Sequence, residues 1–283
     1  MSIAAEHISQ AALLDMMQMF DRQPWTRLLN VELVSLWSLC NTREQQVLLK
    51  DLILKFVVLD SSNEAMVCKQ IDAQFKTWGL APATTRVVAV ADAGEVDGST
   101  AGLQKLKNKI TPFESWHARF YPSISASIAE ISSGDSVVMF DDFVGTGDKI
   151  FKKFEWLSRI KEDLGIDFSI YCVSFAGMAF GIENIKNRCG IPVFSSIILS
   201  KGISEGMPVA DVPRALEVMK EVEFQLGSRY KSKKIRDYSL GYGHSECLYF
   251  WMNDNCPNNV FPIFWWPTLR GGGIRQTLLQ RAG

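Results

Sequence analysis

The chain has 283 residues, of which 47% are hydrophobic and 22% are charged, and its formal net charge is −1. This length and apolar content allow a large core, and the balanced charge excludes a uniformly basic protein that coats nucleic acid. None of the six cysteines forms a C-x-x-C pair, so neither a zinc ribbon nor a redox dithiol is indicated. No apolar run approaches the roughly 20 residues of a membrane span. Because residues 1–10 also lack the apolar region of a secretory signal, we expect a soluble, cytoplasmic protein.

The first 80 residues are predicted to form an N-terminal helical lobe. Apolar residues recur at helical spacing in four stretches, over residues 8–20, 25–40, 45–59 and 63–78. The polar residues 60–63 are typical of a turn followed by a helix N-cap. We interpret residues 1–80 as a packing unit for the domain that follows.

From residue 81 the pattern changes to strands that alternate with helices. Short apolar runs predict strands at residues 86–91, 136–140, 168–175 and 193–199. Helical periodicity follows at residues 148–164, 179–188 and 212–226. This alternation predicts an α/β domain over residues 81–270, with a parallel sheet flanked by helices.

The C-terminal part of the predicted domain differs in composition. Residues 238–270 contain three prolines and several aromatic residues, and we interpret them as an ordered aromatic hood. Residues 271–283 begin with three glycines and are predicted to be a flexible tail, or one ordered only by a partner.

The clearest chemical signal is the segment S-V-V-M-F-D-D-F-V-G-T-G-D-K at residues 136–149. Its strand is predicted to end at Asp141 and Asp142, at the sheet edge where open α/β sheets bind ligands. The Gly-Thr-Gly turn then leads into a helix, so that main-chain N–H groups can surround an anion. Thr146 adds a hydroxyl donor and Lys149 a positive charge, while the acids suit ribose hydroxyls or a metal ion. The segment therefore predicts a sugar-phosphate site.

The alternative interpretation is a turn after a core strand, with Asp142 as a structural cap. Gly-rich turns between a strand and a helix are weak signals alone, but two acids at the same edge favour the ligand site. The sequence has no GxxxxGK[ST] motif, and no GxGxxG motif after a strand. Those nucleotide-binding classes are therefore not indicated.

This segment resembles the phosphoribosyl-diphosphate signature of type I phosphoribosyltransferases: a hydrophobic strand, two acids, a short loop, Thr-Gly and a helix. The resemblance implies that Asp141 and Asp142 are catalytic, hold the ribose 2′ and 3′ hydroxyls, and bind Mg²⁺. It implies that a loop wraps the 5′-phosphate of phosphoribosyl diphosphate or a related nucleotide, and the loop's residues are Gly145, Thr146, Gly147, Asp148 and Lys149. Hydroxyl residues are usual in place of Gly145 and Lys149, and a small residue is usual in place of Asp148.

Two neighbouring segments correspond to other loops of the same fold. Residues 105–119 stand in the place of a mobile catalytic loop, so Arg119 is a third predicted catalytic residue that could stabilise a leaving diphosphate. A solvated basic face is the alternative. Residues 92–99 stand in the place of the pyrophosphate loop, where Gly94, Gly98 and Ser99 could offer N–H groups, although a solvated acidic loop fits the three acids there better.

Over nearly its full length the chain resembles a narrower branch, the phosphoribosyltransferase-like proteins of bacterial conflict and anti-phage systems, some of them beside retron reverse transcriptases. The matching pieces are the helical lobe and residues 97–99, 140–147, 240–243 and 257–265. The resemblance implies a defence effector that partner components of its operon hold inactive, among them a reverse transcriptase–nucleic acid complex. The oligomeric state is left open.

Other chemically suggestive residues have structural defaults. His244 and Glu246 flank a predicted strand, and a lone histidine is more often structural than catalytic. Trp265 and Trp266 can stack on a base, although core packing is the more common role. The basic residues 231–236 form either a solvated face or a contact with nucleic acid.

Three functions remain open from the sequence. The first is an enzyme that acts at the anomeric carbon of a ribose phosphate, by pentosyl transfer or hydrolysis. The second is a sensor that binds a nucleotide without turnover, which the altered Gly145, Asp148 and Lys149 favour. The third is a structural subunit of a nucleoprotein complex. The two acids and the Thr-Gly pair place the enzyme first.

Overall fold

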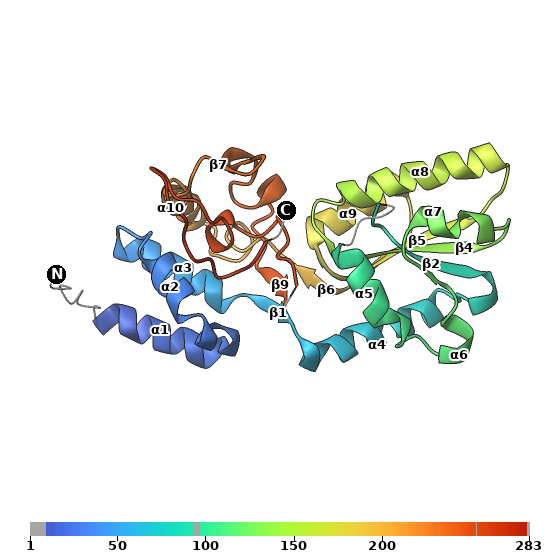
Figure 1. Cartoon of the computed structure of the whole chain (residues 1–283), viewed down its shortest axis with the longest axis horizontal. Coiled ribbons are helices and arrows are strands. Elements are labelled where there is room, and N and C mark those ends of the chain that lie inside the picture. The colour runs from blue at the N-terminus through green and yellow to red at the C-terminus, as the bar shows by residue number, and fades with distance from the viewer. Residues whose placement is uncertain (1–9, 93–96, 253, 282–283) are drawn as a thin grey trace. The chain divides into compact units, whose positions relative to one another are not determined.

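In the computed structural model, residues 59–200 form one unit of the chain, the sheet unit, while residues 1–58 and 201–283 form a second, the terminal unit (Figure 1). The structure describes residues 10–92, 97–252 and 254–281. The boundary expected near residue 80 does not coincide with this division. The reason is that α4 (Ser61–Thr77) packs on the sheet, where the Ser196 hydroxyl donates to the Val67 carbonyl.

The sheet unit is built on a parallel five-stranded sheet with the strand order β3-β2-β4-β5-β6. Its strands are β2 (Thr85–Ala89), β3 (Phe120–Tyr121), β4 (Ser136–Val144), β5 (Ser169–Met178) and β6 (Val193–Leu199). Parallel neighbours need crossover connections. In chain order these are α5 (Gly98–Lys107), α6 (Phe113–Trp116), α7 (Ile124–Ser127), α8 (Asp148–Leu164) and α9 (Ala179–Cys189). Two 3-10 turns complete the unit, η2 (Pro82–Thr84) and η3 (Ile128–Glu130).

The predicted parallel α/β sheet is confirmed, with two differences in detail. Residues 98–133, which lie between the first two predicted strands and for which no element was predicted, contain α5, α6, β3 and α7. β4 extends beyond the predicted end at residue 140, because its ladder with β5 continues to the pair Val144 and Gly177. The two acids of the motif therefore lie inside a paired strand.

Alternating side chains of β4 divide the core into two layers. Val137 and Met139 pack in a cluster that includes Ile150 and Leu157 of α8. Phe140 lies in the other layer, where its ring stands 5.0 Å from that of Phe175 and a Cβ added to Gly102 of α5 would meet it at 2.8 Å. Thus α8 and α5 cover opposite faces of the sheet.

The terminal unit combines the N-terminal helices with the aromatic hood. Its longer helices are α1 (Gln10–Arg22), α2 (Asn30–Trp37), α3 (Arg43–Leu54) and α10 (Val212–Glu223). Short strands pair as β1 (Val57–Leu59) with β9 (Tyr249–Trp251) and β7 (Arg229–Tyr230) with β8 (Lys233–Lys234). The remaining turns are η1 (Pro24–Leu28), η4 (Ile235–Asp237), η5 (Tyr242–His244) and η6 (Pro262–Phe264).

Aromatic contacts tie the hood to the N-terminal helices. The ring of Trp25 lies 4.9 Å from that of Phe250, and the ring of Phe56 lies 5.1 Å from that of Phe264. These edge-to-face contacts bury large apolar area. The hood, which we expected to belong to the sheet domain, is thus part of the terminal unit.

The segment expected to be a flexible tail is packed as far as residue 281. Leu278 and Leu279 are buried, and the Leu279 N–H donates to the Phe264 carbonyl at 3.0 Å. The buried guanidinium of Arg275 donates to the carbonyls of Trp266 and Ile263. The three glycines suggested mobility, but the apolar and charged residues beyond them supply the contacts that fix the segment.

Among the helices of the described residues, none has the length and apolar character that crossing a bilayer requires.

Candidate functional site

The strand order reverses at β2 and β4. β2 continues through α5 toward β3 on one side, whereas β4 continues through α8 to β5 on the other. In open α/β sheets, ligands bind outside the carboxyl ends of strands at such a switch point. The N-termini of α5 and α8 begin there, and each brings a partial positive charge.

Asp141 and Asp142 are consecutive residues of β4, so their side chains are directed to opposite faces of the strand. Asp141 is 3% exposed and accepts a hydrogen bond from Nζ of Lys149, in the first turn of α8, at 3.2 Å. Asp142 lies against the first residue of α5, because a Cβ added to Gly98 would be 2.4 Å from its Oδ2. Each acid is therefore placed at the N-terminus of a different helix.

Lys149 links the two helix N-termini. Its ammonium also donates to Oδ2 of Asp97 at 2.8 Å, while Oδ1 of Asp97 caps α5 by accepting from the N–H of Ser99 at 2.9 Å. Burial acts to lower the pKa of Lys149, but the negative charges of Asp141 and Asp97 outweigh it and raise the pKa above its usual value. The lysine is therefore a fixed cation at this position.

Burial raises the pKa of both acids of β4. For Asp141, the loss of hydration outweighs the opposing effect of the Lys149 ammonium. For Asp142, burial and the adjacent Asp141 carboxylate together raise the pKa well above its usual 3.8. Gly98 allows this crowding, because any other residue at position 98 would place its Cβ on the Asp142 carboxylate.

The loop between β4 and α8 carries a row of main-chain N–H groups without acceptors. Within the described residues, the N–H groups of Thr146, Gly147, Lys149 and Ile150 have no hydrogen-bond partner, and that of Asp148 has only a long contact of 3.4 Å with Oγ1 of Thr146. Gly147, the N-cap, has a φ of 87°. Such a row of N–H groups at a helix N-terminus is a binding site for an anion such as phosphate.

Close packing against α9 fixes this loop. A Cβ added to Gly181 would lie 1.9 Å from the Gly145 carbonyl oxygen, so only glycine permits the contact. The Asn184 amide donates to the Thr146 carbonyl at 3.3 Å. The row of N–H groups is thus held in shape by the rest of the fold, which lowers the cost of ordering the loop around a ligand.

The negative charge of Asp148 is neutralised within the chain. Its Oδ1 accepts from the Arg188 guanidinium of α9 at 2.7 Å, and its Oδ2 accepts from the Thr146 hydroxyl at 2.8 Å. These two hydrogen bonds lower the pKa of Asp148. Arg188 also stacks over the Phe151 ring at 3.7 Å. The departure from the family pattern at Asp148 is therefore accompanied by a compensating cation.

A model of the PRTase-CE family matches residues 15–275. The chain belongs to the PRTase-CE family. This match, together with the sheet topology, confirms the predicted type I phosphoribosyltransferase-like fold. No curated protein matches the chain.

Solved structures similar to this PRTase-CE chain are distant ones. The orotate phosphoribosyltransferase of Aeropyrum pernix is 16% identical with a TM-score of 0.32, over 47% of this chain and 69% of that one. A Giardia lamblia APRTase complexed with 9-deazaadenine is 15% identical with a TM-score of 0.33, and the match covers 49% of this chain and 80% of that one. A hypothetical protein from Neisseria gonorrhoeae with bound ppGpp is 12% identical with a TM-score of 0.35, over 57% and 97%.

The structure does not bring Arg119 to the acid pair. Phe120 of β3 is level with Val87 of β2, which is level with Val138 of β4, so Arg119 stands about five residues, or roughly 17 Å, before Asp142 along the strand direction. It is also two strands away from β4, a further distance of roughly 10 Å. An arginine side chain does not span this separation, so the predicted role of Arg119 needs a rearrangement of the chain.

The loop predicted to correspond to the pyrophosphate loop is only partly described. Gly94 and Glu95 lie outside the described residues. Asp92 pairs with Lys153 of α8 but its side chain remains largely exposed, as expected for a solvated acidic loop. Two participants escaped the sequence-based prediction, Asp97 as the partner of Lys149 and Arg188 as the partner of Asp148. Asp97 begins a capping-box pattern that could have indicated the α5 N-terminus, whereas Arg188 carries no local signal.

The hood residues have structural roles. The Glu246 carboxylate is buried and accepts from the N–H groups of Ile203 and Ser204. Trp265 and Trp266 are buried in the core of the terminal unit. His244 is exposed, and Nδ1 of its ring lies 3.2 Å from the Ser239 carbonyl oxygen. None of these contacts forms a second reactive cluster.

The residues do not form a ready-made site for a divalent cation. Among the described residues, no three His, Cys, Asp or Glu side chains gather as ligands. The Lys149 ammonium already lies between Asp97 and Asp141, where a cation would neutralise both. Bound Mg²⁺ would have to displace this lysine or rely on oxygen atoms of the ligand. The sequence-based expectation of Mg²⁺ at Asp141 and Asp142 stays a prediction.

Proposed function

We propose that the chain binds the ribose 5-phosphate part of phosphoribosyl diphosphate, or of a related nucleotide, between the N-termini of α5 and α8. The observation that carries the proposal is the row of N–H groups at residues 146–150, four of which have no acceptor within the described residues, linked by the Lys149 side chain to Asp141 of the acid pair. A phosphate needs the first feature and a ribose the second, and one lysine side chain spans the distance between them.

Each part of the site has a role in binding. The N–H groups of the loop donate hydrogen bonds to the oxygens of the 5′-phosphate, and the α8 N-terminus stabilises its charge. Asp142, the more exposed of the two acids, accepts hydrogen bonds from ribose hydroxyls. Asp141 and Asp97 hold Lys149 in place, so that its ammonium balances the charge of the acids and remains close to the phosphate.

The same arrangement suits pentosyl transfer or hydrolysis. In this reaction the bond from the anomeric carbon to the leaving oxygen breaks, and the electron pair leaves with the diphosphate. A new bond forms to an acceptor or to water, which loses a proton. Positive charge develops on the sugar ring in the transition state, and the carboxylates of Asp141 and Asp142 stabilise it electrostatically.

Calorimetric titration with ribose 5-phosphate tests the binding proposal. Asp142→Asn should weaken binding at least about tenfold, because a charge-assisted hydrogen bond is lost. Asp163→Asn, which changes an exposed acid near the far end of α8, is the matched control and should bind like the wild type. Equal affinity of all three proteins, or no binding of any phosphorylated pentose, would contradict the proposal.

A sensor without turnover is the second candidate, and the position of Arg119 favours it, because no arginine lies ready to stabilise a leaving diphosphate from that strand. Isotope-labelled phosphoribosyl diphosphate distinguishes the two functions. Release of labelled diphosphate that depends on Asp142 supports the enzyme. Binding without any release supports the sensor.

For the biological setting we propose a defence effector whose target is a nucleotide or nucleic acid and whose activity partner components restrain. The support is the match to the PRTase-CE family over residues 15–275 and the resemblance to anti-phage proteins. Cells that express the chain alone should stop growing, and Asp141→Ala combined with Asp142→Ala should abolish that arrest. Arrest that survives the double substitution would exclude the acid pair as its cause.

A further inference from the structure

The terminal unit contains a basic hairpin. β7 and β8 pair antiparallel, with Arg229 opposite Lys234 and Tyr230 opposite Lys233. Residues 229–237 contain five cations and one acid, although the whole chain has a net charge of −1. Positive charge is thus concentrated in this short segment.

The hairpin is fixed at its base. The Ile235 N–H donates to the Ser228 carbonyl at 3.1 Å, and the Thr268 hydroxyl donates to the Arg229 carbonyl at 3.0 Å. The Tyr230 ring also contacts Trp266, with 6.1 Å between centroids. The basic side chains are therefore presented on an ordered platform and not on a mobile loop.

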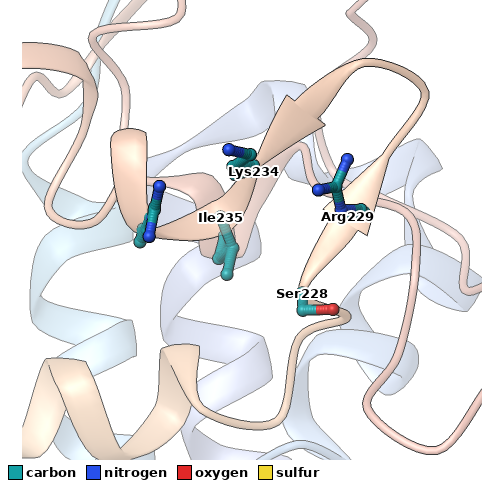
Figure 2. A pocket seen from close by; sticks show the side chains of 5 residues that line it. Ser228, Arg229, Lys234 and Ile235 are labelled. Atoms are coloured by element: carbon teal, nitrogen blue, oxygen red, sulfur yellow. The ribbon is translucent and has the colours of Figure 1, made fainter.

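Three of the cations line a pocket of about 230 Å³, together with Ser228 and Ile235. Figure 2 shows Arg229 and Lys234 on the two strands of the hairpin, with Ser228 and Ile235 at its base. The third cation is Arg236. A pocket of this volume has room for one phosphate group with part of its sugar.

These cations lack the acidic partners that neutralise other basic residues of the chain. In the described part of the chain, no carboxylate forms an ion pair with Arg229 or Lys234, and Arg236 has only its exposed neighbour Asp237, at 3.5 Å. By contrast, Arg214 contacts three glutamates. Burial and the positive charges of Arg281 and Lys231 lower the pKa of Lys233. The hairpin thus carries an unbalanced positive charge.

We propose that this pocket binds a phosphate group in the backbone of a single-stranded nucleic acid. The planar donors of two arginines and the point charge of Lys234 match phosphate oxygens. The Tyr230 ring lies close to one of these cations, with its centroid 5.5 Å from the Lys231 ammonium, and Tyr242, in the following loop, is 41% exposed. A basic surface with aromatic faces is the combination that holds single strands, because bases stack on the rings.

Fluorescence anisotropy with labelled single-stranded DNA and RNA of about 15 nucleotides tests this inference. Three phosphate contacts predict a salt slope of about −2, so the wild type should lose roughly 20-fold in affinity between about 50 and 200 mM salt. Arg229→Gln combined with Lys234→Gln should reduce this loss to roughly threefold. Arg22→Gln combined with Lys69→Gln removes the same charge from exposed positions of α1 and α4, and should leave the slope unchanged.

Three outcomes would overturn the inference. Unchanged affinity and slope in the hairpin variant would show that the pocket is not used. Displacement of the oligonucleotide by an equal phosphate concentration of free mononucleotide would assign the pocket to small anions, and equal displacement by polyglutamate would assign it to acidic proteins.

Arg236→Gln, which alters an exposed side chain with one weak contact, should lower the slope magnitude by about 0.7. This variant tests the inference even if the double variant unfolds. The result does not depend on the ribose-phosphate proposal.

Discussion

Gly98→Ala tests the ribose-phosphate site without removing any of its functional groups. The added Cβ would lie 2.4 to 2.6 Å from the Asp142 carboxylate atoms, so the carboxylate has to move by about 1 Å. A displacement of this size in a positioned group can cost about 100-fold in function. The cost to stability should be smaller, because overpacking costs about 1–3 kcal/mol and alanine regains up to about 1 kcal/mol of helix propensity.

We therefore expect Gly98→Ala to bind ribose 5-phosphate about 100-fold more weakly while its denaturant midpoint changes little. Calorimetry and urea unfolding measure the two quantities on the same samples. Ala101→Ser adds one atom at an exposed position of the same helix and should change neither. If Gly98→Ala bound within about threefold of the wild type, that is within about 0.7 kcal/mol, the position of Asp142 against α5 would not matter for binding.

Three further substitutions probe charge. The folded state raises the pKa of Asp142 above 3.8, so wild-type stability falls as the pH rises past that value. Asp142→Asn should therefore raise the melting temperature at about pH 7 and lose this advantage below about pH 4. Arg188→Met removes the guanidinium, leaves an apolar side chain beside the Phe151 ring and exposes the bound phosphate to the Asp148 charge. Affinity should fall about tenfold, and Asp148→Asn in the same chain should restore it. Burial raises the pKa of Glu223 from 4.5 to about 7, so the wild type loses stability as its carboxyl ionises. The difference in unfolding free energy between Glu223→Gln and the wild type should therefore grow by ~3 kcal/mol in favour of the variant between about pH 4 and pH 8. Urea titrations at the two pH values measure it.

The sequence was sufficient to predict the sheet and the acid pair because both depend on local patterns. Short, mostly apolar runs mark buried strands wherever they occur, and β2, β4, β5 and β6 all coincide with such runs. The short edge strand β3, Phe120–Tyr121, carries no such pattern. β4 was predicted too short, because Asp141 and Asp142 are polar and only their pairing with β5 shows that the strand continues.

Long-range partners could not be predicted in the same way. Lys149 and Asp97 are 52 residues apart in the sequence. They meet only because α5 and α8 start at the same edge of the sheet. The position of Arg119 depends on the register of a two-residue strand. The packing of residues 271–281 depends on carbonyls of the hood that receive the Arg275 guanidinium. Each of these features follows from tertiary contacts that periodicity and spacing do not encode.

The pKa shifts of Asp141 and Asp142 differ in direction from the shift expected of a carboxylate in a structural ion pair. At Asp148 the paired arginine lowers the pKa, as expected for a carboxylate that stabilises the fold. At Asp141 and Asp142 the pKa is raised even though Lys149 is adjacent, so the folded chain holds their charge at a cost in stability. Asp142 is not needed as a helix cap either, because Asp97 caps α5. The two carboxylates destabilise the free protein, and the N–H groups of the neighbouring loop have no acceptors. Both features are expected of a site whose ligand supplies the missing hydrogen bonds.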